Sequence, residues 1–335
     1  MQCKEKLSPA LIVKNLSTRF YTRSGTIYAV NGVNFELPRN RCLALIGESG
    51  AGKSVTALSI LRMIPKPGRI VSGEIRMNGD DLLAKSGSQM RKLRGEELSI
   101  LFQDPLAALN PVITIGNQIR ETIQSHRRAS KSMAEEMALV KLDALKLPAK
   151  RVYNSFPFQL SGGMRQRAAL ALALILHPQI LIADEPTSFL DVTLQGQILA
   201  LLKNELDRCC LSLLFITHDL AAAATVADRV AVMYGGIIVE EGSMRDVFGH
   251  PFHPYTRALL RSHPAFCRNG RLEPVPGSAP LITESFSGCP FRQRCSEAET
   301  ICAEDVPPLA DRGGGRFAAC HKLPEPAKQI MDGSC

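Results

Sequence analysis

One glycine-rich stretch has the residue types and the spacing of a phosphate-binding loop. Residues 47–54 read GESGAGKS, which fits the pattern G-x-x-x-x-G-K-[ST]. They follow the apolar run 42–46 and precede the helix-like segment 55–61. Glycines let the backbone curl with its N–H groups inward, and the N-terminus of the following helix adds partial positive charge. Lys53 can then reach the β- and γ-phosphates of a nucleotide, and Ser54 can place its hydroxyl on Mg²⁺.

Acidic and imidazole side chains follow two other apolar runs. Asp184 and Glu185 come directly after the strand-like run 180–183, and His218 comes shortly after the run 213–216. Such strand ends lie where ligands bind in open α/β sheets. Asp184 is suited to hold hydrated Mg²⁺, and Glu185 to orient or deprotonate a water. An isolated histidine is more often structural, but at a strand end beside a nucleotide we expect His218 to contact the γ-phosphate.

A Ser-Gly-Gly turn opens an alanine- and leucine-rich helix further along the chain. Ser161 fits the N-cap position, and Gly162 and Gly163 leave the amides of the helix start uncovered. Alone, this turn indicates a helix cap and nothing more.

Four cysteines lie close together near the C-terminus. Cys289, Cys295, Cys302 and Cys320 are separated by five, six and seventeen residues, which suggests one tetrathiolate site. The spacing fits neither the common zinc knuckles nor the ferredoxin runs. From chemistry alone, zinc, an iron–sulfur cluster and free thiols are equally open.

The composition is that of a folded protein with one large domain or two smaller ones. The chain has 335 residues, 45% hydrophobic and 21% charged, which can fill a core. The net charge of +8 is spread along the chain and aromatic residues make up 5%, so we expect no nucleic-acid surface. No signal peptide opens the sequence, and the longest apolar run, 168–176, is too short to span a bilayer. We expect a soluble protein without a disulfide framework.

Hydrophobic patterning places these side chains on an α/β fold. Strand-like runs alternate with helical segments, and this alternation predicts a mostly parallel sheet covered by helices. Residues 230–239, with Tyr234-Gly235-Gly236 between apolar halves, predict a closing hairpin. The strand-like runs are 11–16, 27–37, 42–46, 73–79, 98–102, 180–183 and 213–216.

Taken together and in this order, the motifs resemble the ATP-binding subunit of an ABC transporter over about residues 10–262. GESGAGKS resembles the Walker A loop, LSGGM at 160–164 the signature motif, and ILIADE at 180–185 the Walker B strand with its catalytic glutamate. Gln103 resembles the Q-loop glutamine and His218 the switch histidine. Phe20 matches the A-loop aromatic residue best, with Tyr21 as a near alternative.

The resemblance implies an α/β fold, the P-loop NTPase ABC cassette, with a mostly parallel sheet, an antiparallel sheet and a helical subdomain at about 104–178. The ATPase domain would occupy 1–262, and a small cysteine-rich extension 263–335. The resemblance implies that the catalytic residues are Glu185, His218, Gln103 and Lys53, and that Mg²⁺ is bound through Ser54, Gln103 and Asp184. It implies that ATP is bound by Phe20, Gly47, Glu48, Ser49, Gly50, Ala51, Gly52, Lys53, Ser54 and Thr56.

In this family two subunits pair head to tail, so that the Walker A loop of one faces the signature motif of the other. The resemblance therefore assigns the partner's ATP site to Leu160, Ser161, Gly162, Gly163 and Met164, and the D-loop to Ser188 and Asp191. Phe189 departs from the alanine usual in the D-loop. The implied partners are a second ATPase subunit, two transmembrane permease subunits and an extracytoplasmic substrate-binding protein.

Narrower features resemble the peptide and nickel importer branch, whose ATPases commonly pair as two different chains. They are FQDP at 102–105, LNP at 109–111, LSGGMRQR at 160–167 and HPYTRALL at 253–260. We expect a peripheral ATPase at the cytoplasmic face of the bacterial inner membrane that powers uptake of dipeptides or oligopeptides. Import of nickel or another metal chelate is the alternative. A soluble ABC ATPase acting on nucleic acid or ribosomes is a more remote one, because no long coiled coil and no second cassette is present.

The same resemblance bears on the cysteines. The C-terminal segment is similar to the C-terminal extension of peptide-importer ATPases at CPF (289–291), RC (294–295), Cys302 and ACH (319–321). In some of those ATPases the extension holds a [4Fe–4S] cluster. The resemblance thus favours a structural cluster on Cys289, Cys295, Cys302 and Cys320, with zinc as the alternative.

Overall fold

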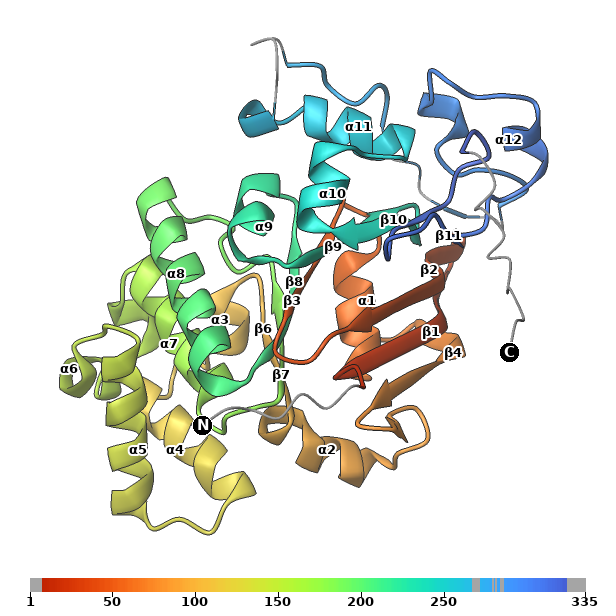
Figure 1. Cartoon of the computed structure of the whole chain (residues 1–335). Helices are drawn as coiled ribbons and strands as arrows, with labels where there is room; N and C mark the ends of the chain where they lie inside the picture. Colours follow the sequence, from red (N-terminus) through yellow and green to blue (C-terminus); the bar gives the residue numbers. More distant parts are fainter. Residues whose placement is uncertain (1–7, 267–271, 279, 281, 284–285, 324–335) are drawn as a thin grey trace, which may run out of the picture.

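The fold consists of two sheets with helices packed around them, as the computed structural model shows for residues 8–266, 272–278, 280, 282–283 and 286–323 (Figure 1). The strands are β1 (Leu11–Thr22), β2 (Gly25–Leu37), β3 (Cys42–Ile46), β4 (Gly68–Met77), β5 (Asp80–Asp81), β6 (Leu98–Leu101), β7 (Ile180–Asp184), β8 (Ser212–Thr217), β9 (Arg229–Tyr234), β10 (Ile237–Ser243), β11 (Ala310–Asp311) and β12 (Phe317–Ala318).

Helices lie mostly between the strands along the chain. The longer helices are α1 (Lys53–Ile60), α2 (Gly87–Glu96), α4 (Ile115–His126), α5 (Lys131–Ala144), α7 (Gly162–Leu174), α8 (Val192–Cys209), α9 (Leu220–Val226) and α11 (Pro254–Arg261). The shorter ones are α3 (Pro105–Ala108), α6 (Ala149–Tyr153), α10 (Met244–Gly249) and α12 (Ile301–Glu304), with 3-10 turns η1 (Pro157–Gln159), η2 (Pro264–Phe266) and η3 (Arg292–Arg294). Within the described residues, no helix is both long and apolar enough to pass through a bilayer.

A mixed sheet forms the centre of the fold. Its strand order is β11-β12-β10-β9-β3-β8-β7-β6, and the strands from β9 to β6 run parallel to one another. The second sheet is antiparallel, with the order β2-β1-β4-β5. The expected combination of a mostly parallel sheet with an antiparallel sheet is confirmed. Because the carboxyl ends of β3, β6, β7 and β8 lie at one edge, the loops that follow them gather there.

Alternate residues of the parallel strands pack on opposite faces of the mixed sheet. On β7, Ile180 and Ile182 belong to the core shared with β1, β2 and α1, whereas Leu181 and Ala183 belong to the core shared with α4, α5 and α7. All four side chains are fully buried. Figure 1 shows α1 between the two sheets, and α3 to α8 on the opposite face of the mixed sheet from α1. The pairings of β7 with β6 and β8, which place Asp184 opposite Ile216, set the position of the acidic residues at its end.

Strand β1 is longer than the predicted run 11–16: it continues to Thr22, so Phe20 and Tyr21 lie within the strand. The hairpin predicted at 230–239 is confirmed, because β9 and β10 pair antiparallel around Gly235 and Gly236. Both glycines have positive φ, 56° and 82°, as a tight two-residue turn requires.

The C-terminal segment joins the mixed sheet and does not form a separate layer. Strand β12 pairs with β10, with Ala318 opposite Glu240, and the Ala319 N–H donates to the Val239 carbonyl at 2.9 Å. Helices α3 to α7 occupy the stretch in which the helical subdomain is expected. The division of the chain at residue 262 stays a prediction, and the sheet crosses it.

Glu240 fastens the chain that leads to α11 onto β10. Its fully buried carboxylate accepts the N–H groups of Phe252 at 2.8 Å and His253 at 2.9 Å, and the Arg316 guanidinium lies 3.5 Å away. Burial raises the pKa of this carboxyl, and the hydrogen bonds and Arg316 partly oppose the rise. The carboxylate thus satisfies two backbone donors that would otherwise lack a partner in the interior.

Replacing Glu240 by Gln tests this anchor. The amide oxygen can accept one N–H, but the amide NH₂ faces the other donor, so we expect the free energy of unfolding to fall by about 2 kcal/mol. The measurement is the urea midpoint at pH 7, beside the exposed control Glu136→Gln. Equal midpoints for the two variants would contradict the anchoring role.

Candidate nucleotide-binding site

The glycine-rich segment forms a tight loop between β3 and α1, as its sequence predicts. A Cβ on Gly47 would lie 2.2 Å from the Met233 carbonyl oxygen, and one on Gly52 would lie 2.3 Å from the Ala29 carbonyl oxygen. Both glycines have positive φ, 155° and 104°. Only glycine fits at these two places, so the loop conformation follows from the sequence.

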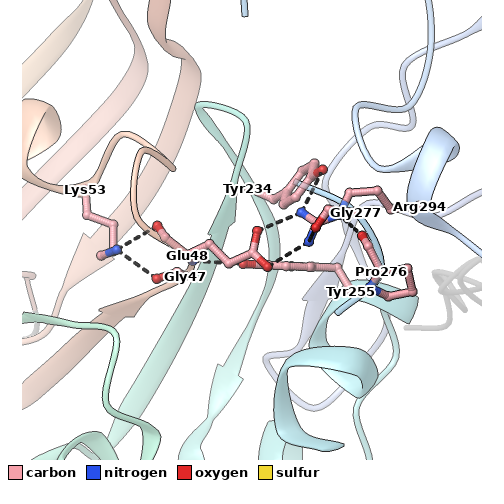
Figure 2. Close-up of polar contacts among 8 residues, drawn as sticks. All are labelled: Gly47, Glu48, Lys53, Tyr234, Tyr255, Pro276, Gly277 and Arg294. Carbon is pink, nitrogen blue, oxygen red and sulfur yellow. Dashed lines mark hydrogen bonds and ion pairs between the residues drawn. The ribbon is translucent and has the colours of Figure 1, made fainter. Parts of the chain in front are cut away.

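The Lys53 ammonium lies on the inner side of this loop. Its Nζ donates to the carbonyl oxygens of Gly47 at 2.8 Å and Glu48 at 2.9 Å (Figure 2). Burial lowers the pKa of Lys53, and the carboxylates of Glu185, Asp184 and Glu48 oppose that shift. A buried cation at a helix start is suited to receive an anionic phosphate.

A cavity of about 200 Å³ opens beside the phosphate loop. Loop residues 50–54 form one wall. The other walls include Ile27 and Tyr28 of β2, Gly235 and Gly236 of the β9–β10 turn, and Pro280 and Ile282 of the C-terminal segment. A planar, largely apolar group such as a nucleobase suits these walls.

Five of the ten residues expected to touch the nucleotide lie outside the lining of this cavity, namely Phe20, Gly47, Glu48, Ser49 and Thr56. Phe20 pairs with Ile27 and lies against Gly68, where an added Cβ would be 2.6 Å from the Phe20 ring. Thr56 is fully buried and donates its hydroxyl to the Gly52 carbonyl oxygen at 3.0 Å. The aromatic side chain at the cavity is that of Tyr28, which sequence reasoning missed.

Two of the three expected magnesium ligands meet at the end of β7. Ser54 donates its hydroxyl to Asp184 Oδ1 at 3.0 Å, although 130 residues separate them in the chain. Burial raises the pKa of Asp184, and the Ser54 hydrogen bond opposes the rise. A hydroxyl and a carboxylate side by side fit Mg²⁺, which keeps several of its waters when it binds proteins.

One oxygen of Glu185 gathers side chains from three loops. Its Oε2 accepts from Gln103 Nε2 at 3.2 Å and from Ser188 Oγ at 2.9 Å, and lies 3.0 Å from His218 Nδ1. Gln103 follows β6, Ser188 lies in the loop after β7, and His218 follows β8. The structure thus brings together Glu185 and His218, both expected at strand ends, with Gln103 and Ser188, which the resemblance assigned to separate loops.

The charges of this group reinforce each other. The hydrogen bond from His218 holds the pKa of Glu185 below its usual range, with Ser188 and Lys53 adding to the effect against burial. The same hydrogen bond raises the pKa of His218, again against burial. Glu185 is thus kept ionised close to the place where Lys53 and Asp184 lie. Its backbone has a positive φ of 47°, which is rare for a residue other than glycine and typical of functional sites.

The signature segment lies away from the phosphate loop of its own chain. The Met164 N–H donates to the Ser161 hydroxyl at 3.4 Å, so Ser161 caps α7 as predicted. Ser161 and Gly162 are exposed, whereas Leu160 and Gly163 are buried. Figure 1 shows α7 and α1 on opposite sides of the mixed sheet. The helix start with its free amides is therefore open to another molecule.

The D-loop also reaches the surface. Asp191 caps α8 by accepting the Leu194 N–H at 2.9 Å, and Phe189 is 89% exposed with a φ of 63°. An exposed aromatic ring in a left-handed backbone conformation has no partner in its own chain among the described residues, and nothing in the structure explains why phenylalanine occupies this position.

Cys289, Cys295, Cys302 and Cys320 all line one small cavity, together with His253 and His321. All four are free cysteines, whereas Cys210, in the cassette, is disulfide-bonded. Burial, with a smaller contribution from the neighbouring thiols, raises the pKa of Cys289 to about 11. The thiols share one cavity as the sequence suggests. Even so, no three His, Cys, Asp or Glu side chains in the described parts of the chain are arranged to hold a metal ion.

Two regions of the chain match known protein families. Residues 30–188 match the family described as ABC transporter, and residues 239–302 match the family described as oligopeptide/dipeptide transporter, C-terminal region. The second match begins in β10 and includes Cys289, Cys295 and Cys302.

Curated relatives align over nearly the whole chain. The probable peptide ABC transporter ATP-binding protein y4tR of Sinorhizobium fredii is 46% identical, over 97% of this chain and 98% of the relative. The oligopeptide transport ATP-binding protein OppD of Bacillus subtilis is 45% identical, over 91% of this chain and 86% of the relative. The dipeptide transport ATP-binding protein DppD of Bacillus subtilis is 42% identical, over 94% and 95%.

A solved ATP-binding cassette has a similar fold to the larger part of this chain. The ATP-binding cassette MJ0796, in a dimeric post-hydrolysis state bound to ADP and Pi, superimposes with a TM-score of 0.64 at 26% identity. The match covers 70% of this chain and 99% of that one. With the phosphate loop, the acidic strand end and the sheet order already established, this chain belongs to the ABC transporter family as an ATP-binding subunit.

Proposed function

We propose that this ABC-type ATPase powers the uptake of dipeptides or oligopeptides across the bacterial inner membrane. The observation that supports the substrate class is the match of residues 239–302 to the C-terminal region of oligopeptide and dipeptide transporters. The relatives named for peptide transport align across both the cassette and this region.

The proposed chemistry is attack of a water on the γ-phosphate of ATP. Lys53 neutralises the phosphates, and Ser54 and Asp184 would hold Mg²⁺, with Gln103 as a further oxygen ligand, so that the ion supplies positive charge against the phosphates. Because the pKa of Glu185 is lowered, this carboxylate is ionised but weakly basic. We therefore assign it to orienting the attacking water more than to removing its proton. His218 holds Glu185 and faces the transferred phosphoryl group.

The adenine is proposed to occupy the cavity beside the phosphate loop. Tyr28 and Ile282 supply apolar walls there. Stacking on an aromatic ring and burial of the base both favour this placement.

Hydrolysis is proposed to need two ATPase subunits. Ser161 and Gly162 are exposed at the start of α7, and Figure 1 shows α7 on the opposite side of the mixed sheet from α1, which Lys53 begins. Placed against the γ-phosphate held by a partner, the amides of this helix start would stabilise its negative charge. The partner is a second ATPase chain, proposed to be non-identical, and both are proposed to dock on two permease subunits at the cytoplasmic face of the membrane, where an extracytoplasmic binding protein delivers the peptide.

The four extension cysteines are proposed to hold a [4Fe–4S] cluster with a structural role. Four free thiols around one cavity supply the donor set that such a cluster needs.

Replacing Glu185 by Gln tests the catalytic assignment in the transporter reconstituted into proteoliposomes with its binding protein. We expect peptide-stimulated ATP hydrolysis to fall about 10²-fold or more, because the amide cannot orient the water as a carboxylate does. ATP affinity should stay within a few-fold of the parent. The measurement is phosphate release with saturating ATP.

The matched control is Glu136→Gln, an exposed glutamate on α5, which should leave the rate unchanged. Hydrolysis by Glu185→Gln within twofold of the parent would contradict the role of Glu185. Stimulation of the parent by nickel chelates and not by peptides would contradict the substrate class.

The pairing of His218 with Glu185 makes a pH prediction. The raised pKa means that the ion pair is fully formed below about pH 6.5 and is lost as the pH rises through the higher value in the folded chain. In an NMR titration of the histidine rings, we expect the His218 pKa to lie above 6.5 in the parent and to drop in Glu185→Gln. An equal pKa in both proteins would show that the two side chains do not interact.

Metal analysis tests the cysteine assignment. After anaerobic purification we expect about four iron and four sulfide per chain, and the loss of both in Cys302→Ser. Cys42→Ser, which changes a buried free cysteine of β3 in the cassette, is the control and should keep them. About one zinc and no iron, or no metal at all, would contradict the cluster.

A further inference from the structure

The phosphate loop is bonded to the C-terminal extension through the side chain of its second residue. Glu48 Oε2 accepts from Arg294 Nη1 at 2.7 Å, and Glu48 Oε1 accepts from Arg294 Nη2 at 2.9 Å (Figure 2). The two residues are 246 positions apart in the sequence. This forked arrangement is the strong form of an arginine–carboxylate pair, because it fixes direction as well as charge.

Arg294 is held in place on several sides. Its side chain is 7% exposed, and that of Glu48 is 22% exposed. The guanidinium also donates to the Pro276 and Gly277 carbonyl oxygens and lies 3.3 Å from the Tyr234 hydroxyl. Such a pair has little freedom to open to water, so it differs from a surface salt bridge, which contributes little.

Glu48 is in turn tied to the functional part of the loop. Its carbonyl oxygen accepts from Lys53 Nζ, and its N–H donates to the Tyr255 hydroxyl of α11 at 2.9 Å (Figure 2). The same residue therefore connects the lysine that faces the phosphates with the arginine of the extension.

A second contact joins the extension to the nucleotide cavity independently. The Tyr28 N–H donates to the Ile282 carbonyl oxygen at 2.8 Å, and both residues line the cavity. The extension thus reaches the nucleotide site at two places, one beside the phosphate loop and one beside the proposed base.

We propose that Arg294 is a positioning residue for the phosphate loop, through which the C-terminal extension sets the affinity of this chain for nucleotide. Glu48 brings a negative charge into the loop that must receive the polyphosphate. Arg294 neutralises that charge and holds the carboxylate away from Lys53. Without Arg294, an unpaired carboxylate would repel the nucleotide and compete for the lysine.

The position of Arg294 depends on the cysteine segment. Arg294 ends η3, and the next residue is Cys295. The Cys289 N–H donates to the Cys302 carbonyl oxygen at 2.8 Å, and the Arg292 N–H to the Cys289 carbonyl oxygen at 3.1 Å. A change in the fold of this segment would therefore move Arg294, which is bonded directly to Glu48 of the phosphate loop.

The inference rests on ATP binding and not on the transported substrate, so its test uses the full chain alone. We would measure the Kd of a fluorescent ATP analogue with Mg²⁺ for the parent, Arg294→Gln, Glu48→Gln and the double variant. Arg294→Gln should raise the Kd about tenfold. The double variant should recover to within about threefold of the parent, because the unpaired charge is gone.

Arg261→Gln is the matched control. It removes an exposed ion pair with Glu273 in the same region and should leave the Kd unchanged. If Arg294→Gln does not fold, Arg294→Lys keeps the charge but loses the fork, and an increase in Kd of about threefold is expected.

Two results would overturn the proposal. One is a Kd for folded Arg294→Gln, or for Arg294→Lys if only that variant folds, within twofold of the parent. The other is a double variant as weak as, or weaker than, Arg294→Gln, which would mean that Arg294 acts through packing and not through Glu48. A parent chain that fails to bind the analogue would instead contradict ATP binding itself, so the two failures are distinguishable.

Discussion

The Glu185 carboxylate accepts hydrogen bonds from three loops on a single oxygen, and the arrangement of the catalytic edge depends on this convergence. It requires β6, β7 and β8 to be adjacent, parallel and in the register in which the structure pairs them. Gln103 and His218 then arrive from the neighbouring strand ends. The low pKa of the carboxyl follows from the same contacts. A shift of one strand by a single residue would reverse its buried faces and disperse the group.

The C-terminal segment extends this arrangement from the sheet to the nucleotide. It adds β11 and β12 to the mixed sheet, lines the cavity beside the phosphate loop with Ile282 and reaches the phosphate loop with Arg294. Small segments with little core of their own fold best when they are docked on a larger one or held by a metal. Here docking and the cysteine cavity act on the same short stretch, so the stability of the extension and the shape of the nucleotide site are physically connected.

Sequence reasoning found the features that depend on local pattern. The glycine loop, the strand ends at Asp184 and His218, and the turn at Gly235 follow from spacing, and the structure has all of them. Contacts between distant segments could not be found this way. Nothing local marks Tyr28 as a cavity residue, because its role depends on the pairing of β2 and on Ile282. The Glu48–Arg294 pair likewise joins residues 246 positions apart. The sequence did carry one signal for this pair: Glu48 is an acidic residue in the phosphate loop, and a carboxylate held there requires a positively charged partner.

The central claim is that this chain holds one half of each ATP site and that a partner supplies the other half. The most direct measurement is a structure of the assembled transporter with Mg-ATP trapped by Glu185→Gln. The account predicts that a triphosphate on Lys53 contacts the signature segment of the partner chain, and that Ser161 and Gly162 here contact the partner's nucleotide. ATP enclosed by one chain alone, with residues 160–164 distant from any phosphate, would contradict it.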